Sequence, residues 1–347
     1  MANSKVLPAL IEQLRTGKDK FDLDVEGHQL SLSHLDKLLW PPVGKGRGFS
    51  KRDLLVYLAQ ASPYLLPHVY NRPITLSRYP DGIQGEHFWQ RHWSSKTPDF
   101  VETVPLSENA GASRDFLMCN NLATLLWLGQ QGNIDLHAWY SRITPEPGRT
   151  NLKSDPDTLT DYPDFIIFDI DPYIYSGSEA KDAEPELNLK GFKQTCQAAL
   201  WFKQILDSLS LTAFIKTSGR TGLHIFVPVR RQFDTAAIRS AAKTISSYLL
   251  EKHPKDISVD WAVEKRSGKI FLDYNQNVRG KTLAAIYSPR PSPQATVSAP
   301  LRWDEVGQAY PTDFTLATMP ERLASVGDIW ADILDRKGDL AKLVDGK

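Results

Sequence analysis

Two carboxylates, Asp169 and Asp171, stand two residues apart at the end of the apolar run FIIFDIDP at 165–172. Side chains alternate between the faces of a strand, so both carboxylates are expected on one face. They repel each other unless a cation lies between them, and Mg²⁺ and Mn²⁺ prefer oxygen ligands. The pair indicates metal-dependent phosphoryl-transfer chemistry. Taken alone, it is equally well explained as the end of an ordinary strand, with one carboxylate capping the turn at Pro172.

A glycine turn between two strand patterns is the second chemical feature. In KTSGRTGLHIFVPV at 216–229, Gly219 and Gly222 separate an apolar strand from another that carries His224. Glycines let backbone N–H groups approach an anion closely, and Ser218 adds a hydroxyl. A hairpin turn also requires glycine, and His224 could be a histidine satisfied at a strand edge. The segment therefore favours a phosphate site without establishing one.

A single acid interrupts the third segment, SGKIFLDYNQN at 267–277. Its alternating residues predict a strand over 268–274, with Asp273 among apolar neighbours. An unpaired carboxylate in that setting is costly, so a metal ion or another cation is expected beside it.

The three segments follow one another in the order DID, SGxxGxH and the Asp of KIFLDYNQN, with helices expected between them. This series resembles the catalytic motifs of the archaeo-eukaryotic primase superfamily. More narrowly, it resembles the polymerase domain of bacterial DNA ligase D and the stand-alone primase-polymerases of non-homologous end joining and gap repair. Further similar segments, between about residues 30 and 330, are LDKLLWPP, RPITLSRYPDG, EHFWQRHW, IDLHAW, RGKT, YSPRP and VSAPLRWDEV.

The resemblance implies an α+β protein with the archaeo-eukaryotic primase fold. We expect a recognition-motif-like antiparallel sheet with flanking helices, plus an N-terminal αβ module, in one compact unit. A division near TPEPGR at 144–149 gives residues 1–150 to the N-terminal module, with a pocket for a DNA 5′-phosphate. Residues 151–347 then form the catalytic core and a C-terminal helix.

The resemblance also assigns the catalytic residues. Asp169, Asp171 and Asp273 correspond to the ligands of two divalent ions, with Mn²⁺ favoured over Mg²⁺. His137 corresponds to a supporting residue near the metals. This chain has Arg220 and Thr221 where relatives often carry lysine before the second glycine, so Arg220 is a candidate replacement for that cation. The residues assigned to the triphosphate of a nucleotide substrate are Ser218, Gly219, His224, Lys281, Arg290 and Arg220.

Contacts with DNA are assigned in the same way. Lys37 and Lys51 match two lysines that hold the 5′-phosphate across a gap, and lysine suits a phosphate as a point charge. Phe88 and Trp89 match an aromatic pair that stacks at the downstream duplex. Neighbours in a strand face opposite ways, so we expect one to be buried and the other, with a slight preference for Phe88, to stack on a base. Contacts with the DNA backbone are assigned to Arg78, Arg91 and Arg266.

Composition sets broader limits. The chain has 347 residues, a formal net charge of zero and 41% hydrophobic residues, which is typical of a globular protein. Basic residues gather at 37–52 and 265–290, whereas acids gather at 154–187. The chain has no apolar run of about 18 residues and no basic, then apolar, N-terminal leader pattern. We expect a cytoplasmic, nucleoid-associated protein, with buried free thiols at Cys119 and Cys196 and no zinc site.

Periodicity places the remaining elements. In the N-terminal part it predicts a hairpin over 21–32, a helix over 51–66 capped by Ser50, and a helix over 116–130. In the second half it predicts helices over 188–209 and 234–252 and an amphipathic helix from 318 onward. Further predictions are a helix over 5–15 and strands over 74–78, 134–142, 165–171 and 212–217.

The leading hypothesis is a template-directed polymerase that fills short gaps or extends broken DNA ends. The resemblance adds a preference for ribonucleotides and for 5′-phosphorylated gaps. One alternative is a primase that needs no primer, and another is a non-catalytic module that binds DNA ends and recruits a ligase and Ku. No KxDG ligase motif is present in this sequence, so sealing would have to come from a partner ligase or from a portion of the protein outside it. The sequence leaves open end joining against excision-gap repair, the physiological metal and the oligomeric state.

Overall fold

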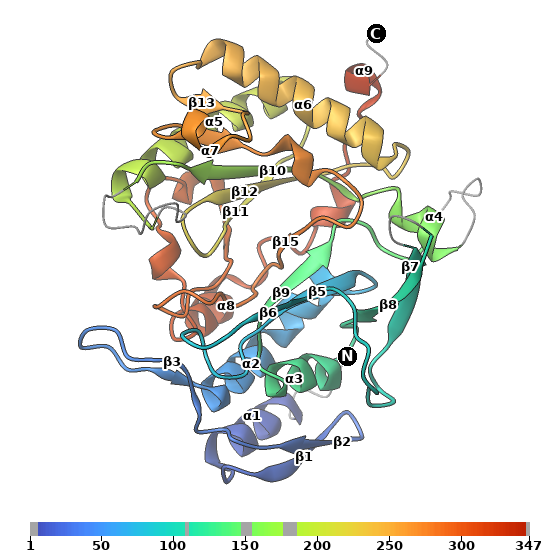
Figure 1. Ribbon diagram of the computed structural model, residues 1–347, viewed down its shortest axis with the longest axis vertical. Coiled ribbons are helices and arrows are strands. Elements are labelled where there is room, and N and C mark those ends of the chain that lie inside the picture. The colour runs from blue at the N-terminus through green and yellow to red at the C-terminus, as the bar shows by residue number, and fades with distance from the viewer. Residues whose placement is uncertain (1–5, 108–110, 147–154, 176–185, 345–347) are drawn as a thin grey trace. The chain divides into compact units, whose positions relative to one another are not determined.

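The computed structural model describes residues 6–107, 111–146, 155–175 and 186–344, which fold into two compact units (Figure 1). Unit 1 comprises 1–139, 283–297 and 314–328, and unit 2 comprises 140–282, 298–313 and 329–347. The expected division at residue 150 lies outside the described residues. The chain instead passes from unit 1 to unit 2 after Trp139 and later returns twice to unit 1, which no single cut in the sequence can describe.

Unit 1 is built on a mixed α/β framework. Its sheet has the strand order β15-β9-β5-β8-β7, and β6 adds to β5. Ser50 caps α2 and forms a capping box with Asp53, as predicted, and the helix continues to Val69. The elements are α1 Val6–Thr16, β1 Phe21–Val25, β2 His28–Leu32, β3 Leu38–Trp40, β4 Phe49–Ser50, α2 Lys51–Val69, β5 Pro73–Arg78, β6 Phe88–Gln90, β7 Thr103–Ser107, β8 Ser113–Met118, α3 Leu122–Gln130, β9 Asn133–Trp139, β15 Thr282–Ala284 and α8 Met319–Val326.

Unit 2 contains a sheet with the strand order β13-β14-β10-β12-β11-β16. Every neighbouring pair is antiparallel except β13 and β14. Helices α5 and α6 run along one side of this sheet (Figure 1). The elements are α4 Pro156–Thr160, β10 Phe165–Pro172, α5 Leu189–Ser208, β11 Phe214–Thr217, β12 Leu223–Pro228, α6 Thr235–Lys252, β13 Ile257–Ser258, α7 Val263–Arg266, β14 Ile270–Leu272, η1 Tyr274–Gln276, β16 Pro300–Leu301, η2 Trp303–Glu305, η3 Pro311–Asp313, η4 Ile333–Asp335 and α9 Ala341–Val344.

The two faces of the unit 2 sheet have different roles. Phe168 of β10 lies with its ring centroid 4.5 Å from that of Phe202 on α5, so this face packs against the helices. Asp169 alternates with Phe168 and therefore points to the opposite face. That face receives the acids, while burial of Phe168 and Phe202 fixes the strand beneath them. The antiparallel sheet with flanking helices confirms the expected fold class.

Three expected elements differ from the sequence interpretation. The helix predicted over 116–130 begins only at Leu122, because Phe116–Met118 belong to β8 and Asn121 caps the helix. Cys119 therefore follows a strand, although both cysteines are free and buried as expected. The C-terminal helix ends at Val326, because Gly327 adopts a φ of 67°. Asp273 stands one residue beyond β14 rather than inside it.

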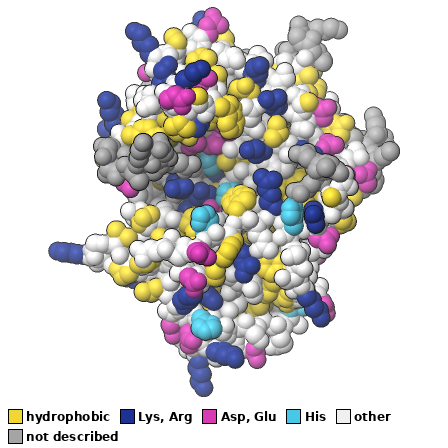
Figure 2. Space-filling model, viewed as in Figure 1, with side chains coloured by type: hydrophobic (Ala, Val, Ile, Leu, Met, Phe, Trp, Pro, Cys, Tyr) yellow, Lys and Arg dark blue, Asp and Glu magenta, His cyan; other side chains and the backbone are white. Residues whose placement is uncertain are grey.

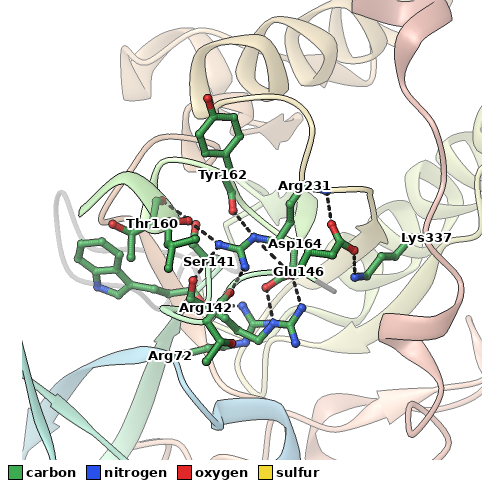
Figure 3. A network of polar contacts seen from close by, with 12 residues as sticks. Arg72, Ser141, Arg142, Glu146, Thr160, Tyr162, Asp164, Arg231 and Lys337 are labelled. Atoms are coloured by element: carbon green, nitrogen blue, oxygen red, sulfur yellow. Dashed lines mark hydrogen bonds and ion pairs between the residues drawn. The ribbon is translucent and has the colours of Figure 1, made fainter. Parts of the chain in front are cut away.

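A buried ionic cluster fixes the segment that leads into β10 (Figure 3). The fully buried Arg231 guanidinium donates to the carbonyls of Tyr162 and Arg142, each at 2.8 Å. Arg142 in turn forms a two-bond ion pair with buried Asp164, at 2.9 and 3.1 Å. The backbone N–H of Val229 donates to the Asp164 carbonyl at 2.8 Å, which ties the end of β12 to the start of β10. Burial makes this cluster costly to disrupt.

Within the described part of the chain, no helix is long and apolar enough to cross a bilayer.

Candidate functional site

A row of three buried polar side chains crosses the face of the unit 2 sheet that points away from Phe168 and α5. The register pairs Lys216 of β11 with His224 of β12, and His224 with Asp169 of β10. Lys216 Nζ lies 2.8 Å from His224 Nδ1, and His224 Nε2 lies 3.3 Å from Asp169 Oδ1. Lys216 also donates to Ser298. Lys216, which the sequence interpretation missed, is therefore the inner end of a row that orients His224 toward an acid.

Asp273, which directly follows β14, lies next to this row although it is far from Asp169 in the sequence. Its backbone N–H donates to the Asp169 carbonyl at 3.3 Å, and its Oδ1 accepts from the Asn275 N–H at 2.9 Å. Gln276 Nε2 in the same short 3₁₀ turn donates to Asp169 Oδ2 at 3.2 Å. Asp171 shares the sheet face with Asp169, since both belong to β10. The fold thus brings the three acids expected from the sequence to one region of one face.

Burial, together with the charge of Asp169, alters the electrostatics around Asp273. Burial and, secondarily, the neighbouring Asp169 raise the pKa of Asp273 to about 6. The Tyr140 hydroxyl has a pKa well above its usual range, because it is buried and also faces Asp169 and Asp273. Asp169 Oδ1 is buried and, although His224 Nε2 lies 3.3 Å away, it makes no hydrogen bond to any described residue. An excess of buried negative charge with an unsatisfied oxygen fits a cation.

The ligand arrangement is nevertheless incomplete. Among the residues that the structure describes, no three His, Cys, Asp or Glu side chains are arranged so that they could hold a metal ion. The donors that the site offers are carboxylate oxygens, which suit Mg²⁺ or Mn²⁺ rather than zinc. The chemistry of the donor set therefore fits a hard divalent ion, and the predicted ligand assignment stays a prediction.

The glycine turn is built by close backbone approach. A Cβ on Gly222 would lie 2.5 Å from the Ile170 carbonyl oxygen and 2.8 Å from Asp171 Oδ1, so only glycine fits beside the acids. Gly219 has a φ of 75°, in the left-handed region that favours glycine. The Ser218 hydroxyl accepts from the N–H groups of Arg220 and Gly222, at 3.1 and 3.0 Å. Ser218 therefore shapes the turn, and exposed Arg220 lies at its tip.

Other predicted residues of unit 2 surround the acids. Lys281 is exposed, and its charge opposes the rise in the Asp273 pKa, as does that of Arg266. The Arg266 guanidinium is buried between two rings, 4.0 Å from the Tyr173 centroid and 4.2 Å from the Phe271 centroid. Lys281 is therefore accessible to a ligand, whereas Arg266 is buried against the rings of Tyr173 and Phe271.

Unit 1 holds a second polar cluster, centred on Asp135. Its Oδ2 lies 3.0 Å from His137 Nε2 and 3.1 Å from Arg290 Nη1. Asp135 and His137 share one face of β9, because they are two residues apart. The Trp89 ring contacts the His137 ring edge-on, at 4.7 Å between centroids. Asp135 was missed in the sequence, although its spacing from His137 in IDLHAW repeats the pattern of the first acid pair.

The prediction that one of Phe88 and Trp89 is buried was wrong. Phe88 is 50% exposed and Trp89 is 49% exposed. Their strand, β6, has three residues and pairs with β5, and each ring stays about half exposed on its own face although Trp89 contacts His137. Both rings are therefore available for stacking on a base. The alternation of side chains along a strand shows which face each ring lies on, but not whether other residues cover that face.

The two lysines predicted to hold a phosphate lie near each other in unit 1. Lys51 is buried, and its Nζ donates to the Ser33 carbonyl at 3.2 Å. Burial and the neighbouring positive charge of Lys37 lower the Lys51 pKa. Lys37 is more exposed and pairs with Asp81 at 2.5 Å. Two cations held in this way favour an anion between them.

Arg78 and Arg91, which were predicted to contact the DNA backbone, also belong to unit 1. Arg78 donates to the Gln131 carbonyl at 3.2 and 3.3 Å, and its guanidinium lies over the Trp93 ring at 5.2 Å. Arg91 is exposed. On the face drawn in Figure 2, Lys and Arg side chains are interspersed with Asp and Glu, consistent with a net charge of zero. Attraction of a polyanion would therefore depend on local groups rather than on the overall field.

The raised Asp273 pKa gives a prediction for stability. An ordinary Asp has a pKa of 3.8, whereas the pKa of Asp273 in the folded protein is about 6. Between these pH values, folded Asp273 keeps its proton and the unfolded chain releases it. The contribution of Asp273 to the free energy of unfolding is therefore most favourable below pH 3.8 and is lost as the pH rises through about 6. Asp273→Asn keeps the oxygen that accepts from Asn275. In buffer with EDTA at pH 7.5 it should raise the free energy of unfolding by up to about 3 kcal/mol, and at pH 4 by much less.

Chemical denaturation of wild type and Asp273→Asn at both pH values measures this difference. Asp256→Asn, which changes an exposed carboxylate of the same unit, serves as the control and should change little at either pH. An equal effect of Asp273→Asn at pH 4 and 7.5 would contradict the electrostatic explanation.

Comparisons with known proteins agree with this geometry. The LigD primase-polymerase domain family matches residues 50–330. The non-homologous end joining proteins LigD of Bacillus subtilis and Pseudomonas aeruginosa are 29% and 30% identical to the chain over 301 and 305 residues. These matches cover 86% and 87% of this chain but only 43% and 32% of those proteins, so the chain spans less than half of their length.

A solved structure gives a third comparison. The polymerase domain of Mycobacterium tuberculosis ligase D, solved in complex with DNA, matches with a TM-score of 0.74 and 24% sequence identity, over 89% of this chain and 99% of that one. The likeness shows a shared fold. Together with the family match over most of the length, it establishes that the chain belongs to the LigD primase-polymerase domain family.

Proposed function

We propose that this chain is a template-directed nucleotidyltransferase that adds nucleotides at short gaps or broken ends of DNA. The observation that carries the proposal is the buried, unsatisfied Asp169 Oδ1 beside Asp273, whose pKa is raised to about 6. Such a concentration of carboxylate charge on one face of a sheet suits phosphoryl transfer, in which cations and anionic phosphates meet. Membership of the LigD primase-polymerase family supports this choice of reaction.

Divalent ions, Mn²⁺ or Mg²⁺, are part of this proposal. Asp169, Asp171 and Asp273 would hold them. When bound, such ions promote ionisation of a primer 3′-hydroxyl and neutralise charge on the triphosphate. The protein contributes the positions of the acids: β10 carries two of them, and the Asp273 N–H bond to the Asp169 carbonyl fixes the third.

The substrate nucleotide, with ribonucleotides preferred, is assigned to the face that carries His224. Lys216 orients the His224 ring, so that Nε2 points toward the acids and can donate to a phosphate oxygen. Exposed Lys281 and Arg220 supply further positive charge in the same unit. Phosphate recognition needs such donors and cations because the acids alone would repel the nucleotide.

The DNA substrate is assigned to unit 1. Lys37 and Lys51 together offer a binding site for a 5′-phosphate, and the two half-exposed rings of Phe88 and Trp89 can stack on bases. Curated relatives are named as bifunctional or multifunctional end-joining proteins, and this chain spans only part of them. We therefore assign ligation to a separate activity, with a DNA ligase and Ku as the proposed partners.

Extension of a gapped, labelled DNA primer tests the function. Wild type with Mn²⁺ should add nucleotides complementary to the template, whereas Asp169→Ala and Asp171→Ala should reduce extension by at least about 100-fold, because removing groups that act at the reacting charge typically costs this much. Both variants should bind the gapped DNA within a few-fold of wild type, since basic and stacking contacts supply that affinity. Unimpaired extension by both variants would refute the proposed active site.

The lysine pair predicts discrimination between gaps with a 5′-phosphate and a 5′-hydroxyl. Lys37→Ala combined with Lys51→Met should remove the preference for the phosphorylated gap and reduce the salt dependence of binding, because one phosphate contact is lost. Methionine is chosen for Lys51 because its side chain is buried. Lys45→Ala, at an exposed position in the nearby loop, is the matched control. A preserved preference in the double variant would argue against this pocket.

Lys216 gives a prediction about nucleotide affinity. Lys216→Met keeps the volume but removes the hydrogen bond to His224, so we expect the KM for the nucleotide to rise about 10-fold or more, with a smaller effect on kcat. Lys243→Met, on the exposed side of α6, is the control. Steady-state kinetics and melting temperatures separate this effect from a loss of folding. An unchanged KM in a folded variant would show that Lys216 does not position His224 for substrate.

A further inference from the structure

An exposed tryptophan lies beside the acid-bearing face of unit 2. Trp261 immediately precedes the short helix α7, and 52% of the residue is exposed. The neighbouring Val263 is 44% exposed. A single exposed apolar residue is common and needs no explanation. What distinguishes Trp261 is the set of groups that hold it.

The Trp261 ring is coupled to the acid cluster through one residue. It contacts the Phe271 ring edge-on, with centroids 5.9 Å apart and planes at 82°. Phe271 stands directly opposite Asp171 in the β14–β10 ladder, so the two side chains share a face of the sheet. Trp261 is thereby placed on the same face as the candidate reaction site.

The rings beneath Trp261 form a rigid support. Arg266 is enclosed between Tyr173 and Phe271, and the two rings are perpendicular, with centroids 5.9 Å apart. A cation between aromatic faces is stabilising, and burial of Arg266 limits its motion. Phe271 is itself buried. The indole is therefore held by its contact with the buried Phe271 ring, while about half of Trp261 stays accessible.

The size and charge of this surface match a nucleobase. A stable protein interface needs about 800 Å² on each partner, far more than one indole and one valine provide. Stacking of a single base on a single aromatic ring requires no larger surface. The segment 260–269 carries exposed Lys265 and partly exposed Lys269, beside Asp260 and Glu264, and these two lysines can contact the phosphates next to a stacked base.

We propose that Trp261 is a stacking platform for an unpaired nucleobase of the DNA strand held at the acid cluster. The inference rests on the proposed function and adds a specific contact to it. It gives the single-stranded part of the substrate a fixed position beside Asp171, separate from the aromatic pair Phe88 and Trp89 in unit 1.

Fluorescence of 2-aminopurine tests the platform directly. Gapped DNA carries one 2-aminopurine, placed in turn at each unpaired template position, and is saturated with full-length protein. Wild type should quench the probe at one position through stacking, and Trp261→Ala should abolish that quenching and weaken binding by about 5- to 150-fold. Trp261→Phe keeps an aromatic face and should retain part of both effects. Melting temperatures of the variants should stay close to that of wild type, because the ring is half exposed.

A matched control is available in the same unit. Tyr248 on α6 is 48% exposed and has Lys252 Nζ 5.4 Å from its ring centroid, yet it lies on a helix outside the sheet. Tyr248→Ala should behave as wild type. If wild type binds and extends gapped DNA, and Trp261→Ala quenches the 2-aminopurine and binds the DNA as well as wild type does, the platform is refuted and the proposed function stands. If wild type itself neither binds nor extends gapped DNA, the proposed function fails and the platform fails with it.

Discussion

Repulsion between buried carboxylates is the constraint on which the functional part of this structure depends. The backbone forces Asp273 against Asp169 through an N–H to carbonyl bond, and β10 presents Asp171 on the same face. Left uncompensated, this charge destabilises the fold, as the raised pKa of Asp273 indicates. Such an arrangement is typical of sites where a cation or an anionic substrate completes the charge balance, and stability is sacrificed for chemistry.

The surrounding scaffold holds these charges in place from two directions. On the face toward α5, the contact between the rings of Phe168 and Phe202 fixes β10 against this helix. At the start of the strand, the buried ion pair of Arg142 with Asp164 and the carbonyl contacts of Arg231 fix the entering segment. A strand held at one end and along one face cannot shift its register to relieve repulsion at the other end, because a one-residue slip would expose its apolar side.

Polar rows that follow the sheet register explain how distant segments act together. Lys216, His224 and Asp169 lie on three adjacent strands and are neighbours only because the strands pair in this register. The same principle joins Asp135 to His137 and Arg290 in unit 1, where two residues of one strand share a face. In both units, a carboxylate contacts a histidine. The basic side chain contacts the histidine in unit 2, where Lys216 lies next to His224, and the carboxylate in unit 1, where Arg290 lies next to Asp135.

The sequence by itself determined the motif acids, the glycine turn and the main helices and strands, because side-chain period and local propensity are properties of neighbouring residues. Gly219 is a clear case, since its φ of 75° is a local property of the turn and favours glycine. Tertiary structure alone decided the rest. Lys216 gained its partner His224 through strand pairing, and Asp135 gained Arg290 from a segment far along the chain. Phe116–Met118 became a strand by joining a sheet, and the rings of Phe88 and Trp89 both stay about half exposed. These outcomes depend on contacts between residues far apart in the chain, which no local pattern encodes.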